Sequence, residues 1–240
     1  MRKIGKMPVW RFGVLVALFL VGSFGLYVGI GQWLTEPSSL SWTLPLNGQV
    51  IVIDAGHGGV DPGAVSKTGV LEKEIALQVA KRLRDYLQQG GAHVIMIREE
   101  DRDLAEEQTK GYSRRKGEDL KERARIIRES DATLFISLHC NAFLSSKSTG
   151  AHTLYDSEFP ESKQLAELIQ AALGETIDNS RNVKKREDLY LLKQANKPGV
   201  LVELGFLSNP DETLQLQTTS YQQKLALGVY KGILSYYANR

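Results

Sequence analysis

The clearest indication of the fold is Gln49-Val-Ile-Val-Ile-Asp54, followed at once by Ala55-Gly-His-Gly-Gly59. A short run of β-branched apolar residues that ends in glycine is typical of a strand buried on both faces. The next segment, 72–89, has apolar residues at helical spacing and stops at Gly90-Gly91. A buried strand followed by a helix predicts the first unit of an α/β sheet.

The same alternation of strand and helix continues to the end of the chain. Further strands are expected at 93–97, 133–138, 151–155, 189–192 and 200–204, and further helices at 118–129, 160–177 and 219–239. Thr219 and Gln222 have the spacing of a capping box at the start of the last helix. We therefore predict a single α/β domain, with a mostly parallel twisted sheet and helices on both faces.

The segment 98–117 is long for a connection, dense in charges of both signs and poor in aliphatic residues. This composition predicts a solvated surface loop. A lid, or a surface for a regulatory protein partner, is the second interpretation.

The N-terminal residues predict export to the outer side of a membrane. Residues 12–30 are apolar or small except for Ser23 and Tyr27 and reach about 28 Å as a helix, enough to span a bilayer. Basic residues precede them, which places the N-terminus in the cytoplasm. We predict a basic tail and membrane-spanning signal anchor at 1–34, a linker at 35–48 and an exported domain at 49–238. A cleaved signal peptide, which would release a secreted protein, is the alternative.

Charge and cysteine content exclude two classes of function. The formal charge is +2, but the first 35 residues carry four basic and no acidic residues, so the remainder has a net charge of −2. Such a domain offers no overall attraction for nucleic acid. The single cysteine, Cys140, excludes an intrachain disulfide and a cysteine-rich zinc cluster. Any metal site must therefore use histidines and carboxylates.

Polar residues follow the predicted strands, where open α/β sheets place their ligand sites. These residues are His57, His139 and Glu203, and Glu72 opens the first helix near the same edge. Two histidines and a carboxylate form a known catalytic zinc set, and Glu203 has the chemistry of a general base and acid. Simpler explanations exist, because the helix dipole favours Glu72 in a first turn and a histidine at a strand end often bonds a carbonyl. No H-E-x-x-H helix is present, so the site would not be that of a zincin.

At these residues the resemblance to a known family becomes specific. The motifs that carry it are Asp54-Ala-Gly-His-Gly-Gly-Val-Asp-Pro-Gly63, Glu72-Lys73, Arg98, Leu120 to Arg123, Phe135-Ile-Ser-Leu-His-Cys-Asn-Ala142 and Val202-Glu-Leu-Gly-Phe-Leu-Ser-Asn209. Over residues 49–238 the chain resembles the zinc-dependent N-acetylmuramoyl-L-alanine amidases of type 3, which are peptidoglycan hydrolases. The resemblance implies one Zn²⁺ ion bound by His57, Glu72 and His139, with Glu203 as the catalytic carboxylate. It also implies cleavage of the amide between the lactyl group of N-acetylmuramic acid and the L-alanine of the stem peptide.

Within that family the chain is similar to the sporulation branch. The similarity lies in the N-terminal anchor, the loop Thr109-Lys-Gly-Tyr-Ser-Arg-Arg115 and the lack of wall-binding repeats. It implies a role in spore cortex maturation, through muramic δ-lactam, or in germination. No inserted helix follows the glycine-rich loop, so we expect an open cleft, with control by expression, location or a partner.

Several neighbouring residues carry their own expectations. Asn141 and His152 are the candidate substrate contacts, although a solvated or carbonyl-bonded side chain is the alternative for His152. Arg98 and Arg123 are expected to hold carboxylates inside the fold, with substrate binding as the alternative. Cys140 is expected to be a small buried residue beside a ligand, with thiolate ligation as the alternative.

Two other functions remain open from the sequence. One is a non-catalytic module that binds peptidoglycan or regulates, and the other is a zinc peptidase that cuts within the stem peptide. Retention of all four candidate residues favours an enzyme over the module. The peptidase differs from the amidase only in the product that it releases.

Overall fold

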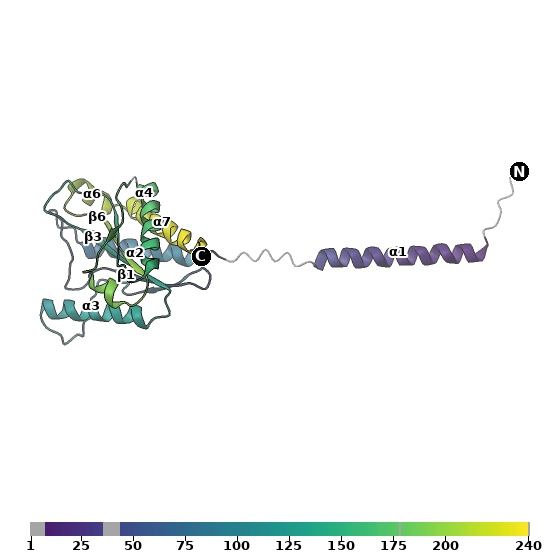
Figure 1. The fold of residues 1–240 in the computed structure, drawn as a ribbon, viewed down its shortest axis with the longest axis horizontal. Coiled ribbons are helices and arrows are strands. Elements are labelled where there is room, and N and C mark those ends of the chain that lie inside the picture. The colour runs from purple at the N-terminus through teal and green to yellow at the C-terminus, as the bar shows by residue number, and fades with distance from the viewer. Residues whose placement is uncertain (1–7, 36–43, 178, 240) are drawn as a thin grey trace. The chain divides into compact units, whose positions relative to one another are not determined.

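The computed structural model describes residues 8–35, 44–177 and 179–239. It divides into two units, split between residues 43 and 44. The first unit contains α1 (Val9–Thr35), which Figure 1 shows as one continuous helix. Its large side chains, such as Phe19, Val21 and Phe24, are exposed. No helix among the described residues combines the length and apolar character needed to cross a membrane. The N-terminal helix is present, but its predicted role as a membrane span is not confirmed.

The second unit begins earlier than the predicted domain start at residue 49. It runs from Leu44, and Leu46 is fully buried against the core. Residues 44–48 therefore belong to the domain and not to the linker. Most of the remaining predicted linker, 36–43, and the basic residues of 1–7 lie outside the described residues.

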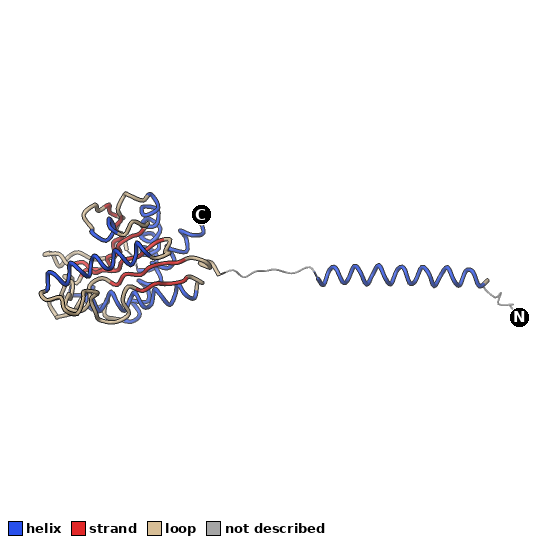
Figure 2. Tube along the Cα trace, turned by 90° about the horizontal axis from the view of Figure 1, so that it is seen from below, coloured by secondary structure: helices blue, strands red, loops and turns tan. Residues whose placement is uncertain are grey.

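A six-stranded sheet forms the centre of the domain (Figure 2). Its strands are β1 (Val50–Ala55), β2 (His93–Met96), β3 (Leu134–Asn141), β4 (His152–Tyr155), β5 (Lys184–Lys185) and β6 (Gly199–Phe206), in the order β2-β1-β3-β6-β4-β5. The first four in that order are mutually parallel, β4 is antiparallel to β6, and β5 is parallel to β4. The predicted mostly parallel sheet is confirmed, with a two-strand antiparallel edge.

Helices cover both faces of the sheet, as predicted (Figure 1). On one face lie α2 (Glu72–Gln89), α4 (Pro160–Ile177) and α7 (Thr219–Ala238), and on the other lie α3 (Tyr112–Glu129) and α5 (Tyr190–Gln194). The short helix α6 (Pro210–Leu216) follows β6. We call the two sides the α2/α4/α7 face and the α3/α5 face.

Alternation along the strands divides the core between the two faces. On β1, Ile51 and Ile53 pack on the α2/α4/α7 face, whereas Val52 packs on the α3/α5 face with Phe135 and Leu201. Because side chains alternate along a strand, residues two or four positions further along face the same side. The polar residues that follow Val52, Phe135 and Leu201 at this spacing therefore point toward α3 and α5.

Three expected elements differ from the structure. Residues 189–192 are not a strand, because Tyr190–Gln194 forms α5, and a four-residue apolar run does not distinguish the two states. The helix predicted from 118 begins at 112, directly after Gly111 with φ +90°. The segment 98–117 is consequently not one solvated loop. The last helix is capped by Thr218, whose side chain accepts from the Tyr221 N–H, and not by Thr219.

Helix α6 was not predicted, although the sequence before it has the residues of a typical helix start. Asn209 caps it by accepting hydrogen bonds from the Asp211 and Glu212 N–H groups, and Pro210 occupies its first turn. An asparagine followed by proline is a typical helix start.

Candidate metal centre

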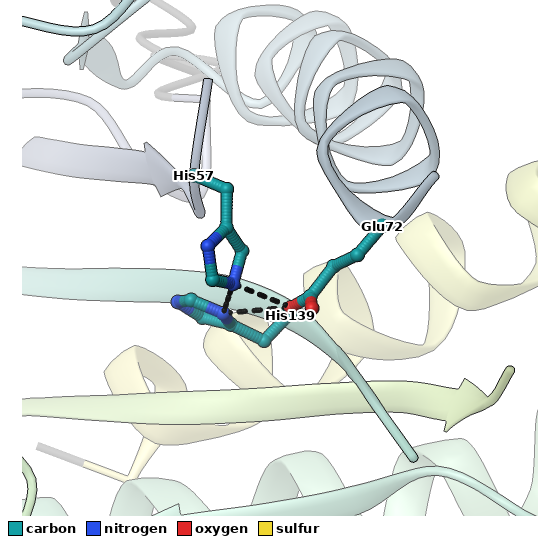
Figure 3. Close-up of side chains that lie close together, drawn as sticks. All are labelled: His57, Glu72 and His139. Carbon is teal, nitrogen blue, oxygen red and sulfur yellow. Dashed lines mark hydrogen bonds and ion pairs between the residues drawn. The ribbon is translucent and has the colours of Figure 1, made fainter. Parts of the chain in front are cut away.

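Three separate elements bring His57, Glu72 and His139 together (Figure 3). His57 lies in the loop that follows β1, Glu72 is the first residue of α2, and His139 lies near the end of β3. Because β1 and β3 are parallel neighbours, with Ala55 opposite Leu138, the two histidines emerge at the same edge. The sequence-based grouping of these residues at one carboxyl edge is confirmed.

The three side chains are spaced as the ligands of one metal ion would be. His57 Nε2 lies 3.2 Å from His139 Nδ1 and 3.1 Å from Glu72 Oε1, and His139 Nδ1 lies 2.9 Å from Glu72 Oε1. Ligand atoms about 2.1 Å from a shared tetrahedral zinc ion lie about 3.4 Å apart. Two imidazoles and a carboxylate are also a donor set that zinc accepts. The residues present fit a bound metal ion with small adjustments.

Burial and charge favour a cation at this cluster. Glu72 is buried, and its Oε1 and Oε2 accept hydrogen bonds from the Cys140 and Ala64 N–H groups. Although burial opposes ionisation, His139 and His57 hold the pKa of Glu72 well below its usual range. The side chains of His57 and His139 keep 17% and 21% of their surface exposed, so the cluster opens to solvent. A substrate can therefore reach a cation held there.

Two glycines make room for the ligands. A Cβ on Gly56 would collide with the ring of His139. A Cβ on Gly63, where φ is +69°, would come 2.5 Å from Glu72 Oε2 and 2.7 Å from His57 Cδ2. The glycine-rich loop is thus required both for its backbone conformation and for space.

Asp61 is a site residue to which the sequence alone assigns no role. Its Oδ2 lies 2.8 Å from His57 Nδ1, on the side of the ring away from the cluster. Burial would lower the pKa of His57, but hydrogen bonds to Asp61 and Glu72 raise it to about 9. The sequence feature that could have indicated this role is the position of Asp61, four residues after the candidate ligand His57 in a tightly turning, glycine-rich loop.

Glu203 lies next to the cluster, in a row of paired residues that crosses β3, β6 and β4. On β6 it pairs with His139 of β3 on one side and with His152 of β4 on the other. Its Oε2 is buried and finds no hydrogen-bond partner among the described residues. Burial, opposed by His139 and reinforced by the negative charge of Glu72, raises the pKa of Glu203 to about 7. A carboxyl group with that pKa exchanges protons readily near neutral pH.

The two candidate substrate contacts occupy different places. His152 is half-buried and directly opposite Glu203, and burial together with Arg181 and Lys184 lowers its pKa. Asn141 ends β3 opposite Phe206, beyond a register shift, and is half-buried. His152 therefore shares the row of Glu203, whereas Asn141 lies one step outside it.

The expectation for the two arginines holds for one of them. Arg123 binds Asp54 at 2.6 Å and Asp119 at 2.8 Å, all three buried. No carboxylate among the described residues is bound by Arg98, and its guanidinium donates instead to the carbonyls of Ala55, Gly56, Lys73 and Glu100. The reason is its position under the loop of His57, where backbone carbonyls and not acidic side chains face inward.

Cys140 and the cleft agree with the simpler expectations. Cys140 packs in the core of the α2/α4/α7 face, and burial raises the pKa of its thiol, so thiolate ligation is not supported. No helix lies between β1 and α2 in the fully described stretch 56–71. A pocket of about 200 Å³ adjoins the cluster, lined by His57, His139 and Lys116 and by the apolar side chains of Leu189 and Leu201.

The fold is that of an α/β protein, and three side chains at the carboxyl edge of its sheet can hold a metal ion. A family model described as N-acetylmuramoyl-L-alanine amidase matches residues 51–235, and the chain belongs to this family. The chain is 45% identical to the germination-specific N-acetylmuramoyl-L-alanine amidase of Bacillus subtilis (strain 168), over 100% of this chain and 98% of that protein.

Solved structures agree with this assignment. The CwlD amidase from Clostridioides difficile, in complex with the GerS lipoprotein, is 43% identical with a TM-score of 0.78, over 80% of this chain and all of that chain. An N-acetylmuramoyl-L-alanine amidase from Clostridium difficile 630 is 31% identical with a TM-score of 0.71, over 81% and 99% of the two chains. The predicted family and its amidase activity are confirmed, and the non-catalytic alternative loses its support.

Proposed function

We propose that this amidase depends on one Zn²⁺ ion held by His57, Glu72 and His139, with Glu203 as its catalytic acid and base. The bond cleaved is the amide between the lactyl group of N-acetylmuramic acid and the L-alanine of the stem peptide. The observation that carries the proposal is the convergence of the three candidate ligand atoms beside the buried carboxyl group of Glu203.

The proposed site contains the groups that amide hydrolysis requires. Zinc, when bound, supplies a Lewis acid that polarises a carbonyl and acidifies water. An amide also has a poor leaving group, so one side chain must take a proton from the attacking water and another proton must reach the departing amine. Glu203, whose buried carboxyl group lies beside the candidate ligand His139, performs both transfers in turn. Its unpartnered Oε2 is the atom available for this proton.

We further propose that substrate lies along the edge of the sheet that contains the row His139, Glu203 and His152. His152 is half-buried next to Glu203 on the side opposite His139, a position that suits contact with the stem peptide. Asn141 lies close to the end of the same row and is proposed as a second contact.

The proposed biological role is in spore cortex maturation, through muramic δ-lactam, or in germination. It is supported by the 45% identity, along the whole chain, to an amidase named for germination. This role requires the domain to act outside the membrane, with peptidoglycan as its substrate. The exposed apolar side chains of α1 support attachment of the chain to a membrane, which extraction of cell membranes with alkaline carbonate would test.

A regulatory protein partner is proposed to contact the segment 98–117. Support comes from the similar CwlD amidase, which was solved in complex with the GerS lipoprotein. The cleft is not covered by a helix after the glycine-rich loop, so we expect the purified chain to act without a partner. An inert, zinc-loaded chain that a partner activates would contradict this expectation.

Mass spectrometry of muropeptides tests the proposed reaction. Denuded cortex peptidoglycan is digested with the purified chain, with and without a zinc chelator. We expect stem peptides with a new N-terminal L-alanine, and we expect their formation to stop with the chelator and return when zinc is added. Release of a D-amino acid would identify a peptidase, and digestion unaffected by the chelator would contradict the zinc dependence.

A further inference from the structure

Helix α3 presents a stripe of polar side chains to the loop of His57. Tyr112, Lys116, Asp119 and Arg123 recur at intervals of three or four residues and so share one side of the helix. Arg123 Nη2 donates to the backbone carbonyl of His57, and Arg123 also binds Asp119. At the other end of the stripe, Tyr112 and Lys116 reach Asp61. One helix therefore contacts this loop at two points.

Asp61 is fixed by four separate contacts. The Tyr112 hydroxyl donates to Oδ1 at 3.0 Å, and the Gly63 N–H donates to the same atom at 3.1 Å. Lys116 Nζ lies 3.0 Å from Oδ2, and His57 Nδ1 lies 2.8 Å from it. The Asp61 side chain is only 7% exposed. With both carboxylate oxygens engaged, Asp61 has little freedom to rotate.

The orientation of Asp61 decides where His57 points. A histidine binds a metal through one ring nitrogen, and the hydrogen bond on the other nitrogen sets both tautomer and ring angle. Here Asp61 takes Nδ1, which leaves Nε2 facing Glu72 and His139 (Figure 3). His57 also has a positive φ of 60°, so its backbone gains from an external restraint.

We propose that Tyr112 and Lys116 are positioning residues for the metal ion: they hold Asp61, and Asp61 holds the ring of His57 in its binding orientation. The inference rests on the proposed zinc site. It gives a specific task to the first turns of α3, which the sequence places in a charged surface loop. Lys116 also lies 5.8 Å from the centre of the Tyr112 ring, so the two side chains support each other.

Zinc affinity of the full chain, purified in detergent and stripped of metal, tests this inference without relying on catalysis. Zinc is titrated in competition with a chromophoric chelator. Loss of an outer partner of a metal-bound histidine weakens binding about 10-fold to 100-fold, which we expect for Asp61→Asn. We expect a loss of about 10-fold for Lys116→Met and several-fold for Tyr112→Phe, with partial recovery in Lys116→Arg. Lys121→Met, on the exposed side of the same helix, is the matched control and retains wild-type affinity.

A double-mutant cycle separates positioning from a general effect on the helix. If Lys116 acts through Asp61, Lys116→Met causes no further loss of zinc affinity in an Asp61→Asn background. Thermal unfolding of the metal-free variants shows whether folding has changed, and Tyr112→Phe, which removes a single oxygen atom, keeps the test valid if Lys116→Met fails to fold. Unchanged affinity in both single variants, or an equal loss in the Asp61→Asn background, would overturn the inference. A wild-type chain that binds no zinc would instead contradict the proposed function.

Discussion

The two faces of the sheet differ most at the carboxyl ends of the strands. On the α2/α4/α7 face the strands are apolar along their length, from Ile51 and Leu134 to Val202 and Leu204. On the α3/α5 face the apolar series is short, and the same strands then carry Asp54, Ser137, His139 and Glu203. Along these strands one face thus serves packing alone, whereas the other combines packing with buried charge.

Stability and chemistry therefore depend on different buried groups of the α3/α5 face. Buried charges are costly unless they are paired and hydrogen-bonded. On the α3/α5 face Asp54 is paired with Arg123 and accepts a hydrogen bond from Ser137, while Glu203 is left without a partner for Oε2. The paired groups support the site, and the unpaired group is the one that we propose performs the chemistry. Four predictions test this division.

The largest effect is expected for Glu203→Gln. Because Gln cannot exchange the proton, initial rates on denuded peptidoglycan should fall about 1,000-fold. Zinc content, measured by atomic absorption, should remain one ion per chain, because Glu203 is not among the three candidate ligands. In contrast, His57→Ala and Glu72→Ala should lose both zinc and activity. Turnover retained by Glu203→Gln would remove its assigned role.

Arg123→Met should cause the largest loss of stability. The substitution leaves Asp54 and Asp119 buried without their partner, and breaking a buried ion pair costs about 3–5 kcal/mol. Urea unfolding of the wild type and variant measures the change in the free energy of unfolding. Arg125→Met, an exposed arginine on the same helix, is the control and should unfold like the wild type. Equal midpoints for Arg123→Met and Arg125→Met would show that the buried network does not support the fold.

Much of this architecture was predictable from the sequence, and the failures have physical causes. A continuous run of β-branched apolar residues located β1, helical spacing of apolar residues located α2, and the helix expected at 160–177 matches α4, because these signals lie in the local sequence. The boundary of α3 was not predictable, because Arg115 and Lys116 look solvated in the sequence but pair with Asp103 and Asp61 in the structure. Such pairs join distant segments, and local composition does not encode them.

The candidate site was likewise predictable only in part. His57, Glu72 and His139 were found together because parallel strands bring their carboxyl ends to one edge. The roles of Asp61 and Arg98 were missed, because each depends on contacts with a loop whose path only the tertiary structure shows. The proposed substrate contacts remain predictions, since they depend on a ligand as well as on the fold.

The dependence of stability on pH tests the cost of leaving Glu203 unpaired. Its pKa is raised from 4.5 to about 7 in the folded chain, so the folded state binds a proton more tightly than the unfolded state does. Stability of the metal-free protein should therefore fall as pH rises from about 4.5 to about 7, by up to about 3 kcal/mol. Glu203→Gln should remove this loss and be more stable than the wild type at about pH 8, with little difference at about pH 4.5.

Urea unfolding of chelator-treated protein at several pH values measures this effect. Glu175→Gln, an exposed residue of α4, is the matched control and should follow the wild type at every pH. A difference between Glu203→Gln and the wild type that does not vary with pH would show that the carboxyl group is not destabilised by burial.

The smallest effect is expected at Val202, the neighbour of Glu203 that faces the other side of the sheet. Val202 is fully buried against the α2/α4/α7 face, and Val202→Ala should cost about 2 kcal/mol of stability through lost apolar burial and a small cavity. Its amidase rate per folded molecule, measured well below the unfolding temperature, should stay within about twofold of the wild type. Adjacent residues on one strand would then have different effects on the rate: Glu203→Gln would lower it, whereas Val202→Ala would lower stability and leave the rate almost unchanged. A loss of rate in Val202→Ala as large as that in Glu203→Gln would mean that the two faces are mechanically coupled, because packing on one face would then control the position of the carboxyl group on the other.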